Sequence, residues 1–452
     1  MQGSMVAIMQ ETRATFRVQK TVLAAAAASC LAVGFASPNA MATELQEDAE
    51  LLFCPRPGAE TLADGPQADI NTATAEHAEA AAATPVLQDS NTDALRVATY
   101  NANLTREAPG DLFEELSSPG VEDATRVART IQTVRPDVLV LTGIDVDVDS
   151  GDNIAKAFNT NYLAVGGDEH TGITYPYMYT APSNVGVDSG ADINRNGTIG
   201  DPGDALGYGK FPGQRSMIVY SQYPLDTDNI RDFTSMPWET MPDNSIPAEL
   251  SELERDLVPL ASVSHWDIPV EVNGETVHVL ATSTADASES SYGTARNHDQ
   301  IRFWQDYIDP ETQYIRDHRG NEGPLAEDAD FVLAGSLKAD PSGLGPADPT
   351  AISSLLASDQ IIDPEPARTI TASALSRGIL PATPEATHHT GPAPTEHDDT
   401  YRADYVLLSS ELDVADSGVL ETDSTHPSYG LFGLQAEEDE THIVWADITL
   451  AD

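Results

Sequence analysis

Residues 121–141 read VEDATRVARTIQTVRPDVLVL, and this stretch decides the fold class. In its first part, Val121 to Val134, apolar residues such as Val127 and Ile131 recur at helical spacing. The run that follows, Asp137–Leu141, is almost wholly apolar and is typical of a buried strand. A helix followed at once by a buried strand predicts a layered α/β domain.

Further segments on either side carry the same patterns. Arg96–Tyr100 is expected to form a strand before the helix, and Asn297–Tyr307 is expected to form a second helix with Asn297 as its N-cap. Long connections rich in Pro, Gly and Asp separate the segments, so we expect large loop insertions. The remaining predicted strands are Ser216–Tyr220, Thr276–Thr282, Phe331–Ala334, Ala403–Leu408 and His442–Ile448.

The charge balance is strongly acidic. The chain of 452 residues has 23 Lys plus Arg against 73 Asp plus Glu, a formal charge of −50. Such a charge excludes tight binding to nucleic acid or to an anionic membrane except at high salt. Because lysines occur only at positions 20, 156, 210 and 338, we interpret the chain as adapted to high salt; an ordinary acidic secreted protein is the alternative.

The N-terminus predicts export. Arg13, Arg17 and Lys20 precede the apolar run Thr21–Phe35, which ends at the small-x-small sequence Ala40-Met41-Ala42. We interpret residues 1–42 as a signal peptide cleaved near Ala42, which gives an extracellular or periplasmic protein; lipidation at Cys30 is the lesser alternative. No later segment approaches the ~20 apolar residues that a membrane span needs.

Two regions should follow the signal peptide. Residues 43–93 are rich in Ala, Pro and acidic residues and lack periodicity, so we expect a linker or arm. Residues 94–452 form the folded domain. Only Cys54 remains after cleavage, and a single cysteine cannot form an internal disulfide.

In their order along the chain, the segments from residue 94 resemble the endonuclease/exonuclease/phosphatase superfamily, the DNase-I-like fold, and in particular an exported bacterial subgroup. The resemblance implies a four-layered α-β-β-α sandwich with a metal-dependent phosphoesterase site where the strand ends meet. The residues that carry it are Ala98-Thr99-Tyr100-Asn101, Arg135-Pro136-Asp137-Val138-Leu139, Tyr175-Pro176-Tyr177, Phe211-Pro212-Gly213-Gln214, Met217–Pro224, Ser264-His265-Trp266-Asp267, Asn297-His298-Asp299 and Arg402–Leu407.

The resemblance also implies which positions carry the chemistry. Asn101 and Asp404 match retained positions of the family. At six further positions, the metal ligand, the histidines and the Asp/Asn pair that the family uses are replaced by other residues, which indicates degenerate catalytic motifs. The replaced positions are Gly143, Ser283, Ser336, Lys338, Glu440 and Thr441.

These replacements favour a non-catalytic function. An ammonium at Lys338 opposes Mg²⁺ binding and can take over its charge, so we expect a phosphorylated or other anionic ligand near Lys338, or a scaffold. The alternative is an active Mg²⁺- or Mn²⁺-dependent phosphodiesterase or phosphatase with relocated ligands. Candidate groups for this rewired site are Asp145, Asp147, Asp340, Asp404, Asp439, Glu440 and His442.

A separate metal signal lies in a loop. Residues 192–199 read DINRNGTI and match the opening of an EF-hand-type calcium loop, with Ile199 as the apolar anchor. The twelfth position is Gly203 instead of Glu, so Asp201 or Asp204 would supply the last carboxylate. We expect Ca²⁺ to fix the insertion over residues 183–211; a polar turn without metal is the alternative. The predicted ligands are Asp192, Asn194, Asn196, Thr198, Asp201 and Asp204.

Overall fold

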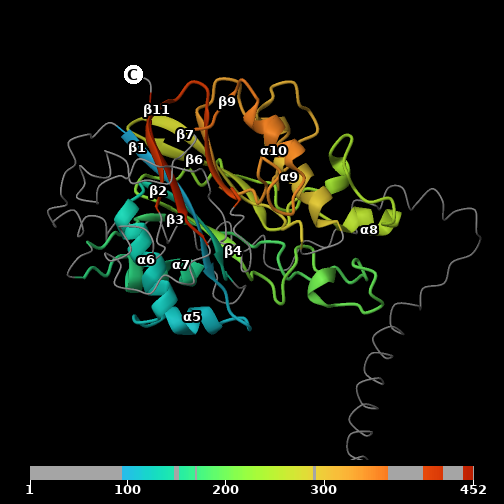
Figure 1. Ribbon diagram of the computed structural model, residues 1–452, viewed down its shortest axis with the longest axis horizontal. Coiled ribbons are helices and arrows are strands. Elements are labelled where there is room, and N and C mark those ends of the chain that lie inside the picture. Colours follow the sequence, from blue (N-terminus) through green and yellow to red (C-terminus); the bar gives the residue numbers. More distant parts are fainter. Residues whose placement is uncertain are drawn as a thin grey trace, which may run out of the picture. The chain divides into compact units, whose positions relative to one another are not determined.

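Two mixed β-sheets packed face to face form the core of the described domain. The computed structural model describes residues 94–146, 152–167, 171–288, 292–364, 401–420 and 441–450. The predicted signal peptide, the 43–93 linker, Asp147, Asp439 and Glu440 lie outside these residues. Helices cover the outer faces of the two sheets, α5 to α7 on one side and α9 and α10 on the other (Figure 1). The predicted four-layered α/β sandwich is therefore confirmed.

The first sheet has six strands in the order β11-β12-β1-β2-β4-β3. Its first strand β1 lies between the parallel strand β2 and the antiparallel strand β12, which comes from the end of the chain. The bounds are β1 Ala94–Leu104, β2 Val138–Ile144, β3 Tyr177–Tyr179, β4 Ser216–Ser221, β11 Asp413–Leu420 and β12 Ile443–Thr449.

A buried ion pair joins the two ends of the domain's chain within this sheet. The Arg96 Nε atom lies 2.6 Å from Asp447 Oδ1, and both side chains are almost fully buried. The Arg96 guanidinium also stacks over the Trp445 ring at 4.1 Å. Strands β1 and β12 are thus held by side chains as well as by their backbone ladder.

The second sheet also has six strands, in the order β5-β6-β7-β8-β10-β9. Strands β7 and β8 are parallel, whereas β6 and β10 run antiparallel to their neighbours. The bounds are β5 Arg231–Asp232, β6 Ser264–Val272, β7 Glu275–Ser283, β8 Phe331–Ser336, β9 Ile361–Ile362 and β10 Asp404–Ser409.

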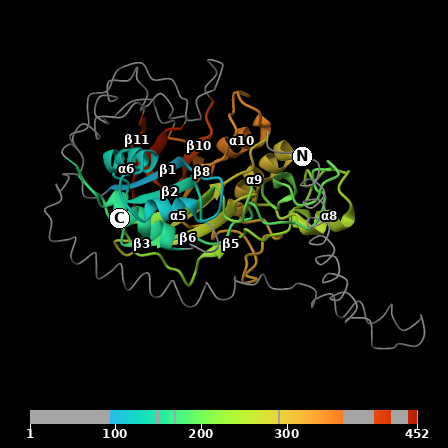
Figure 2. The same cartoon turned by 90° about the horizontal axis from the view of Figure 1, so that it is seen from below.

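Helices α5, α6, α9 and α10 pack through their apolar sides, whereas α8 has no buried residue. Figure 2 places α6 and α8 towards opposite ends of the molecule, with the strands between them. The helices described are α5 Asp111–Leu116, α6 Glu122–Val134, α7 Asp152–Phe158, α8 Glu252–Leu257, α9 Gly293–Ile308 and α10 Pro349–Leu356. Short turns of other helix types cover Asn159–Leu163, Pro202–Asp204 and Trp238–Thr240.

The core between the sheets comes from alternate residues of each strand. Val140 of β2 and Val444 of β12 meet Val279 of β7, Val332 of β8 and Val406 of β10 in one apolar cluster. Because side chains alternate across a strand, residues an even number of positions away point to the same inner face. This rule places several polar residues at one end of the inter-sheet core.

All the predicted strands are present, but the predicted start of the second helix is wrong. Helix α9 begins at Gly293, with Tyr292 at the N-cap and no side-chain cap. Asn297 lies one turn inside and is fully buried. Its Nδ2 atom donates to Leu337 O at 2.9 Å and to Thr284 Oγ1 at 3.0 Å, so it fastens the helix to the loops after β7 and β8.

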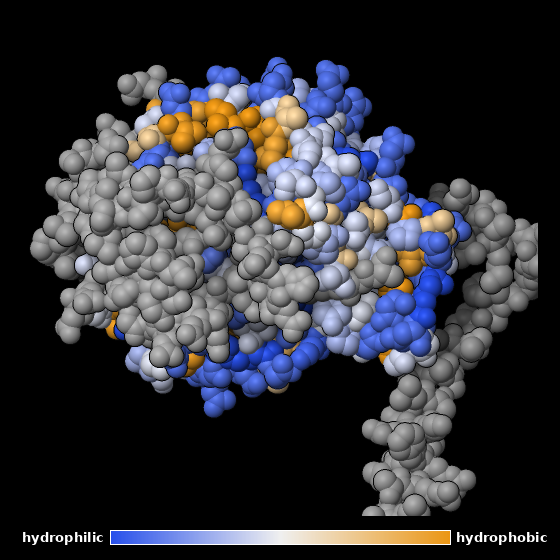
Figure 3. Space-filling view, viewed as in Figure 1, coloured by the Kyte–Doolittle hydropathy of each residue, from blue (hydrophilic) through white to orange (hydrophobic). Residues whose placement is uncertain are grey.

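Among the coloured residues of Figure 3, hydrophilic ones are the most frequent, but a contiguous apolar patch lies at the upper left and smaller apolar patches lie elsewhere. Exposed large apolar side chains in the described ranges include Ile199 and Leu253. No helix in the described part of the chain has both the length and the apolar character to cross a membrane.

Candidate functional site

One row of polar residues crosses the second sheet where β6, β7, β8 and β10 meet their loops. The strand register pairs Ser264 with Ser283, Ser283 with Ser336, and Ser336 with Asp404. Each residue lies an even number of positions from the inner-face residues of its own strand, so all four side chains point into the end of the inter-sheet core. We call Ser264, Ser283, Ser336 and Asp404 the strand-end row; all four are buried.

The first sheet contributes polar residues to the same end of the core. Asn101 of β1 and Thr142 of β2 lie an even number of positions from the inner-face residues of their strands. His442 comes just before β12 and two positions before the inner-face residue Val444. Thr441 Oγ1 donates to the Asn101 carbonyl at 2.6 Å. The structure therefore brings together Asn101, Thr441 and His442.

Lys338 follows the row on the loop after β8. Its backbone is left-handed, with φ of 52°, and its N–H donates to Ala403 O at 2.9 Å. The half-buried ammonium makes no hydrogen bond or ion pair with any residue that the structure describes. Its charge nevertheless acts on two carboxylates, Asp286 and Asp404.

Asp286, which follows β7, is affected by charged residues from both sheets. Burial alone would raise the pKa of its carboxyl, but Lys338, the Ser288 hydrogen bonds and Arg215 together lower it. Arg215 immediately precedes β4 in the first sheet. Two cations and Asp286 thus gather at this end of the sandwich.

Asp404 at the end of the row has the opposite shift. Burial raises the pKa of its carboxyl to about 7, although a hydrogen bond from Ser336 and the charge of Lys338 oppose the shift. Burial, followed by Asp286 and Asp404, also raises the pKa of the nearby Tyr401 to about 12. The site therefore holds a carboxyl group that changes charge near neutral pH.

Gly143 has a conformation that disfavours a side chain. Its φ is 66°, and a Cβ atom built there would lie 2.1 Å from Asn101 Oδ1. The Asn101 carboxamide occupies that space and accepts from Asn103 N at 3.3 Å. Restoring a metal-binding Glu at 143 would therefore require both a backbone change and a new position for Asn101.

Two candidates for relocated ligands already have backbone partners. Asp145 accepts from Arg106 N at 2.7 Å and from Arg215 N at 2.9 Å. Asp340 accepts from Ser342 N and from Arg402 N, each at 2.7 Å. Within the described ranges, no three His, Cys, Asp or Glu side chains are placed to hold a metal ion.

The structure gathers the predicted calcium ligands in one loop. Asp192 Oδ1 accepts from Asn196 N at 3.0 Å, and the buried Asp204 accepts from Asn194 N at 3.2 Å. The Asn194 and Asn196 amides donate to Asp201, and Asn196 is the first of the hydrogen-bond partners that lower the pKa of Asp201.

The remaining loop residues differ in how well they match the calcium pattern. Thr198 lies beside Asn196, to whose Oδ1 its N–H donates at 2.7 Å. The predicted anchor Ile199 is wrong, since it is 65% exposed; Ile193 is the residue that enters the core. Calcium binding stays a prediction.

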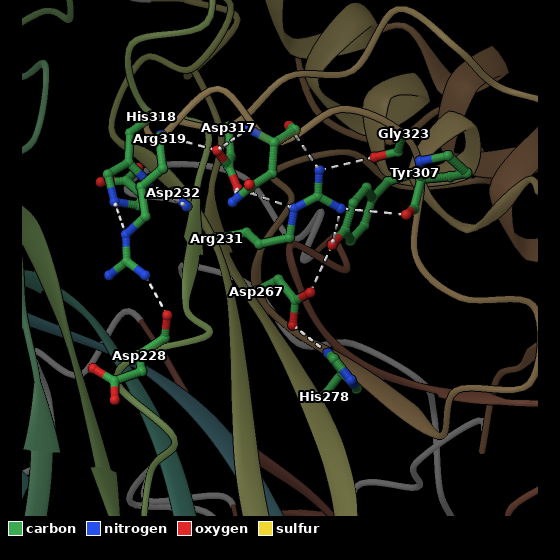
Figure 4. Close-up of polar contacts among 12 residues, drawn as sticks. Asp228, Arg231, Asp232, Asp267, His278, Tyr307, Asp317, His318, Arg319 and Gly323 are labelled. Carbon is green, nitrogen blue, oxygen red and sulfur yellow. Dashed lines mark hydrogen bonds and ion pairs between the residues drawn. The ribbon is translucent and has the colours of Figure 1, made fainter.

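A second polar cluster lies on the outer face of the second sheet (Figure 4). The buried Asp267 of β6 accepts from Tyr307 of α9 at 2.6 Å, and its other oxygen lies 2.7 Å from His278 Nδ1. Arg231 of β5 donates to the Tyr307 hydroxyl at 3.2 Å and to Asp317 at 3.3 Å. We call Arg231, Asp267, His278, Tyr307 and Asp317 the outer-face network.

The sequence interpretation did not identify Ser264, Asp286 or Arg215 as site residues. In the sequence, Ser264 stands out only as the first residue of the Ser264-His265-Trp266-Asp267 segment of the resemblance, and its neighbours in the row depend on the register of four strands. Asp286 and Arg215 lie on loops, where no periodicity indicates the direction of a side chain.

The solved structures similar to this chain are distant ones, and a search of curated proteins gives no match. An endonuclease/exonuclease/phosphatase from Beutenbergia cavernae is 20% identical with a TM-score of 0.44, covering 79% of this chain and 72% of that one. The mannosyl-6-phosphatase of Bacteroides thetaiotaomicron is 12% identical with a TM-score of 0.41, and the alignment covers 79% of this chain and 100% of that one. Sphingomyelinase C of Streptomyces griseocarneus is 16% identical with a TM-score of 0.37, and the alignment covers 79% of this chain and 99% of that one.

The sequence profile of the endonuclease/exonuclease/phosphatase family matches residues 98–426, and the chain belongs to this family.

Proposed function

We propose that this chain is an exported, salt-adapted family member that binds a phosphorylated or other anionic small ligand beside Lys338 without a catalytic metal. The observation that carries the proposal is the Lys338 ammonium, which has no ion-pair partner in the described ranges and lies next to the strand-end row. A half-buried cation that no described carboxylate contacts within ion-pair distance can attract a bound anion.

The residues at the strand ends do not fit Mg²⁺ or Mn²⁺. Divalent metals of this kind need several oxygen ligands, usually including carboxylates. Gly143 offers no side chain, Asn101 occupies the space beside it, and the Lys338 charge opposes a cation. Asp145 and Asp340 already accept two backbone hydrogen bonds each. These contacts support a degenerate site.

One observation favours the alternative of an active phosphoesterase with relocated ligands. His442 and Asp404 share the inter-sheet end of the core, and the pKa of Asp404 is raised to about 7, in the range of a general acid or base. Such an enzyme would still need a metal or another group to stabilise the phosphoryl charge, and the described cations at this end of the sandwich are Lys338 and Arg215.

Calorimetric titration separates the two functions. The mature chain in EDTA would be titrated with 4-nitrophenyl phosphate and 4-nitrophenyl sulfate, and we expect binding of at least one without turnover. Lys338→Met should weaken that binding at least tenfold. Lys156→Met on α7 is the matched control, because Lys156 lies on the helix layer away from the site.

Two outcomes would contradict the proposal. Binding that is equal in the Lys338→Met variant would place the anion elsewhere. Turnover in Mg²⁺ or Mn²⁺ that EDTA abolishes and that survives repurification would establish the hydrolase alternative.

We also propose that the Asp192–Asp204 loop binds a structural Ca²⁺ ion. The support for this proposal is that the three carboxylates lie close together, since Asn194 bonds to both Asp201 and Asp204, and Asn196 to both Asp192 and Asp201. Saturating Ca²⁺ should raise the melting temperature, with about 2.7 kcal/mol of stabilisation at a hundredfold excess over Kd. Asp192→Ala should abolish the response, whereas an identical response in that variant would indicate general screening of the acidic surface.

A further inference from the structure

The Asn297 side chain joins the loops after β7 and β8. Its Nδ2 atom donates to Ala285 O at 3.0 Å and to Leu337 O at 2.9 Å. These two carbonyls come immediately before Asp286 and Lys338 in the chain. Asn297 is fully buried on α9, which packs on the outer face of the second sheet. One side chain from the helix layer therefore holds both the segment that carries the carboxylate and the segment that carries the cation.

The backbone that leads into Lys338 is fixed by further contacts. The Thr284 hydroxyl, which accepts from the same carboxamide at 3.0 Å, donates to Leu337 O at 2.8 Å. The Thr284 N–H donates to Ser336 O at 2.9 Å. The N–H groups of Leu337 and Lys338 both donate to Ala403 O, at 2.8 and 2.9 Å. The two peptide groups between Ser336 and Lys338 are thus hydrogen-bonded on both sides, which sets the position of the Lys338 Cα atom.

Two unfavourable features meet at this contact. The left-handed φ of 52° at Lys338 is strained for a residue with a Cβ atom, and such strain persists only where surrounding contacts impose it. The Asn297 Oδ1 atom is buried and has no hydrogen-bond partner among the described residues, which is a further cost. Because backbone strain of this kind gathers at functional sites, a positioning role explains the contact better than stability alone.

The contact also sets the distance between two opposite charges. Burial raises the pKa of the Asp286 carboxyl, and the Lys338 charge is the first of the interactions that bring it below its usual value. The two groups nevertheless form no ion pair in the described structure. Since the Asn297 carboxamide holds the carbonyl before each of them, it keeps the ammonium near the carboxylate without letting the two side chains neutralise each other.

We infer that Asn297 is a positioning residue of the proposed anion site, where its carboxamide fixes the Leu337–Lys338 peptide and so holds the Lys338 ammonium in the place where an anion binds. Asn297 acts through Lys338 and does not contact the ligand. The inference rests on the proposed anion-binding function and adds the residue that organises its cation.

A double-mutant cycle tests whether Asn297 acts through Lys338. The mature chain in EDTA would be titrated by calorimetry with 4-nitrophenyl phosphate and 4-nitrophenyl sulfate. Asn297→Ala should weaken binding of the ester that the wild type binds at least fivefold. In the Lys338→Met background the same change should alter the remaining affinity less than twofold. An equal loss in both backgrounds would overturn the inference.

A matched control comes from the same helix. Asp299 is also buried on α9, but it accepts from Trp238 Nε1 and from Ser245, away from the two loops. Asp299→Asn should lower the melting temperature and leave the affinity unchanged. A loss of affinity equal to that of Asn297→Ala would show that general loosening of the helix is sufficient, and the inference would be wrong.

A second variant covers the case in which Asn297→Ala does not fold. Thr284→Val keeps the volume of the buried side chain and removes the hydroxyl that donates to Leu337 O. In the same cycle it should weaken binding at least twofold in the wild-type background and leave it unchanged in the Lys338→Met background. An unchanged affinity in both backgrounds would overturn the inference.

The strain at Lys338 gives a readout that needs no ligand. Glycine adopts the left-handed region freely, so Lys338→Gly should raise the melting temperature of the wild-type chain. The rise should be smaller in the Asn297→Ala or Thr284→Val chain, whose loop can relax. An equal rise would show that other contacts impose the conformation, against the inference.

Failure of this inference and failure of the proposed function give different results. If an ester binds and depends on Lys338, but Asn297→Ala and Thr284→Val leave its affinity unchanged, the anion site stands and the positioning role is wrong. If neither ester binds and Lys338→Met changes nothing, the proposed function itself is wrong, and the positioning role is wrong with it.

Discussion

The second sheet has polar clusters on both faces, and they use their hydrogen-bonding groups differently. In the outer-face network, both carboxylate oxygens of Asp267 have side-chain partners. Arg231 contacts Asp317, Tyr307 and the backbone carbonyls of residues 321, 323 and 324. In the strand-end row, Ser264, Ser283 and the nearby Lys338 have none among the described residues.

The difference shows how to tell a polar cluster that stabilises the fold from one that binds a ligand. A buried network whose donors and acceptors are matched within the protein makes the fold rigid and specific. A cluster with unused hydrogen-bond donors and a cation can instead make binding of a ligand favourable. Substitutions in the outer-face network should therefore change stability, and substitutions near the strand-end row should change binding.

The largest expected effect comes from Arg231→Met in the outer-face network. This change removes the cation that pairs with the buried Asp317 carboxylate, which keeps its hydrogen bonds from Arg319 N and Asn321 but loses its charged partner. It should lower the free energy of unfolding by about 3–5 kcal/mol. Denaturant titration measures the loss. Arg316→Met, an exposed neighbour, is the control and should change stability by less than about 0.5 kcal/mol. A weaker affinity for 4-nitrophenyl sulfate in the folded Arg231 variant would break the proposed separation.

A medium effect of opposite sign is expected for Asp404→Asn. Because the folded-state pKa of Asp404 is raised to about 7, its folded form holds a proton that the unfolded form releases at about pH 4. Its contribution to stability is therefore complete at low pH and is lost as pH rises through 7. The variant should gain about 1–3 kcal/mol at pH 8 and nothing at pH 4.

Denaturant titrations at several pH values check this prediction. Asp413→Asn is the control, because Asp413 is exposed at the start of β11. If Asp404→Asn destabilises the chain at pH 8, Asp404 belongs with the satisfied groups, and the contrast between the two clusters is weaker than stated.

The smallest effect is expected for His278→Gln. The imidazole is 23% exposed and contacts Asp267, which keeps its Tyr307 hydrogen bond in the variant. Loss of one partly solvated contact should cost about 1 kcal/mol. Thermal unfolding of the variant beside wild type measures it, and a loss as large as that of Arg231→Met would show that His278 is a central member of the network.

Much of the fold could be predicted from the sequence because each strand carries its own pattern. The run Val138–Leu141 is apolar on both faces, as a central strand covered on both sides must be. Asn297 was misinterpreted because a residue favoured at helix N-caps also suits a buried hydrogen-bonding role. Nothing in the sequence around Tyr292 indicates a helix start, since no side chain caps it.

The site was only partly predictable. The replaced residues could be named from the resemblance, yet their geometry depends on contacts between distant segments. The position of Asn101 in the space beside Gly143 requires the φ of 66° and the bulged pairing of β1 with β2. The unused donors of Ser264 and Ser283 become visible only when every possible partner has been placed.

The Arg96–Asp447 pair has a consequence for the timing of folding. Its partners are 351 residues apart in sequence, and β1 needs β12 on one edge before the first sheet is complete. While the chain is being synthesised, β1 and β2 can pair, but the other edge of β1 stays open until the last strand emerges. Contacts of such long range slow folding, because loop closure must precede their stabilising effect. A chain that ends before Ile443 would keep the edge of β1 exposed and prone to aggregation.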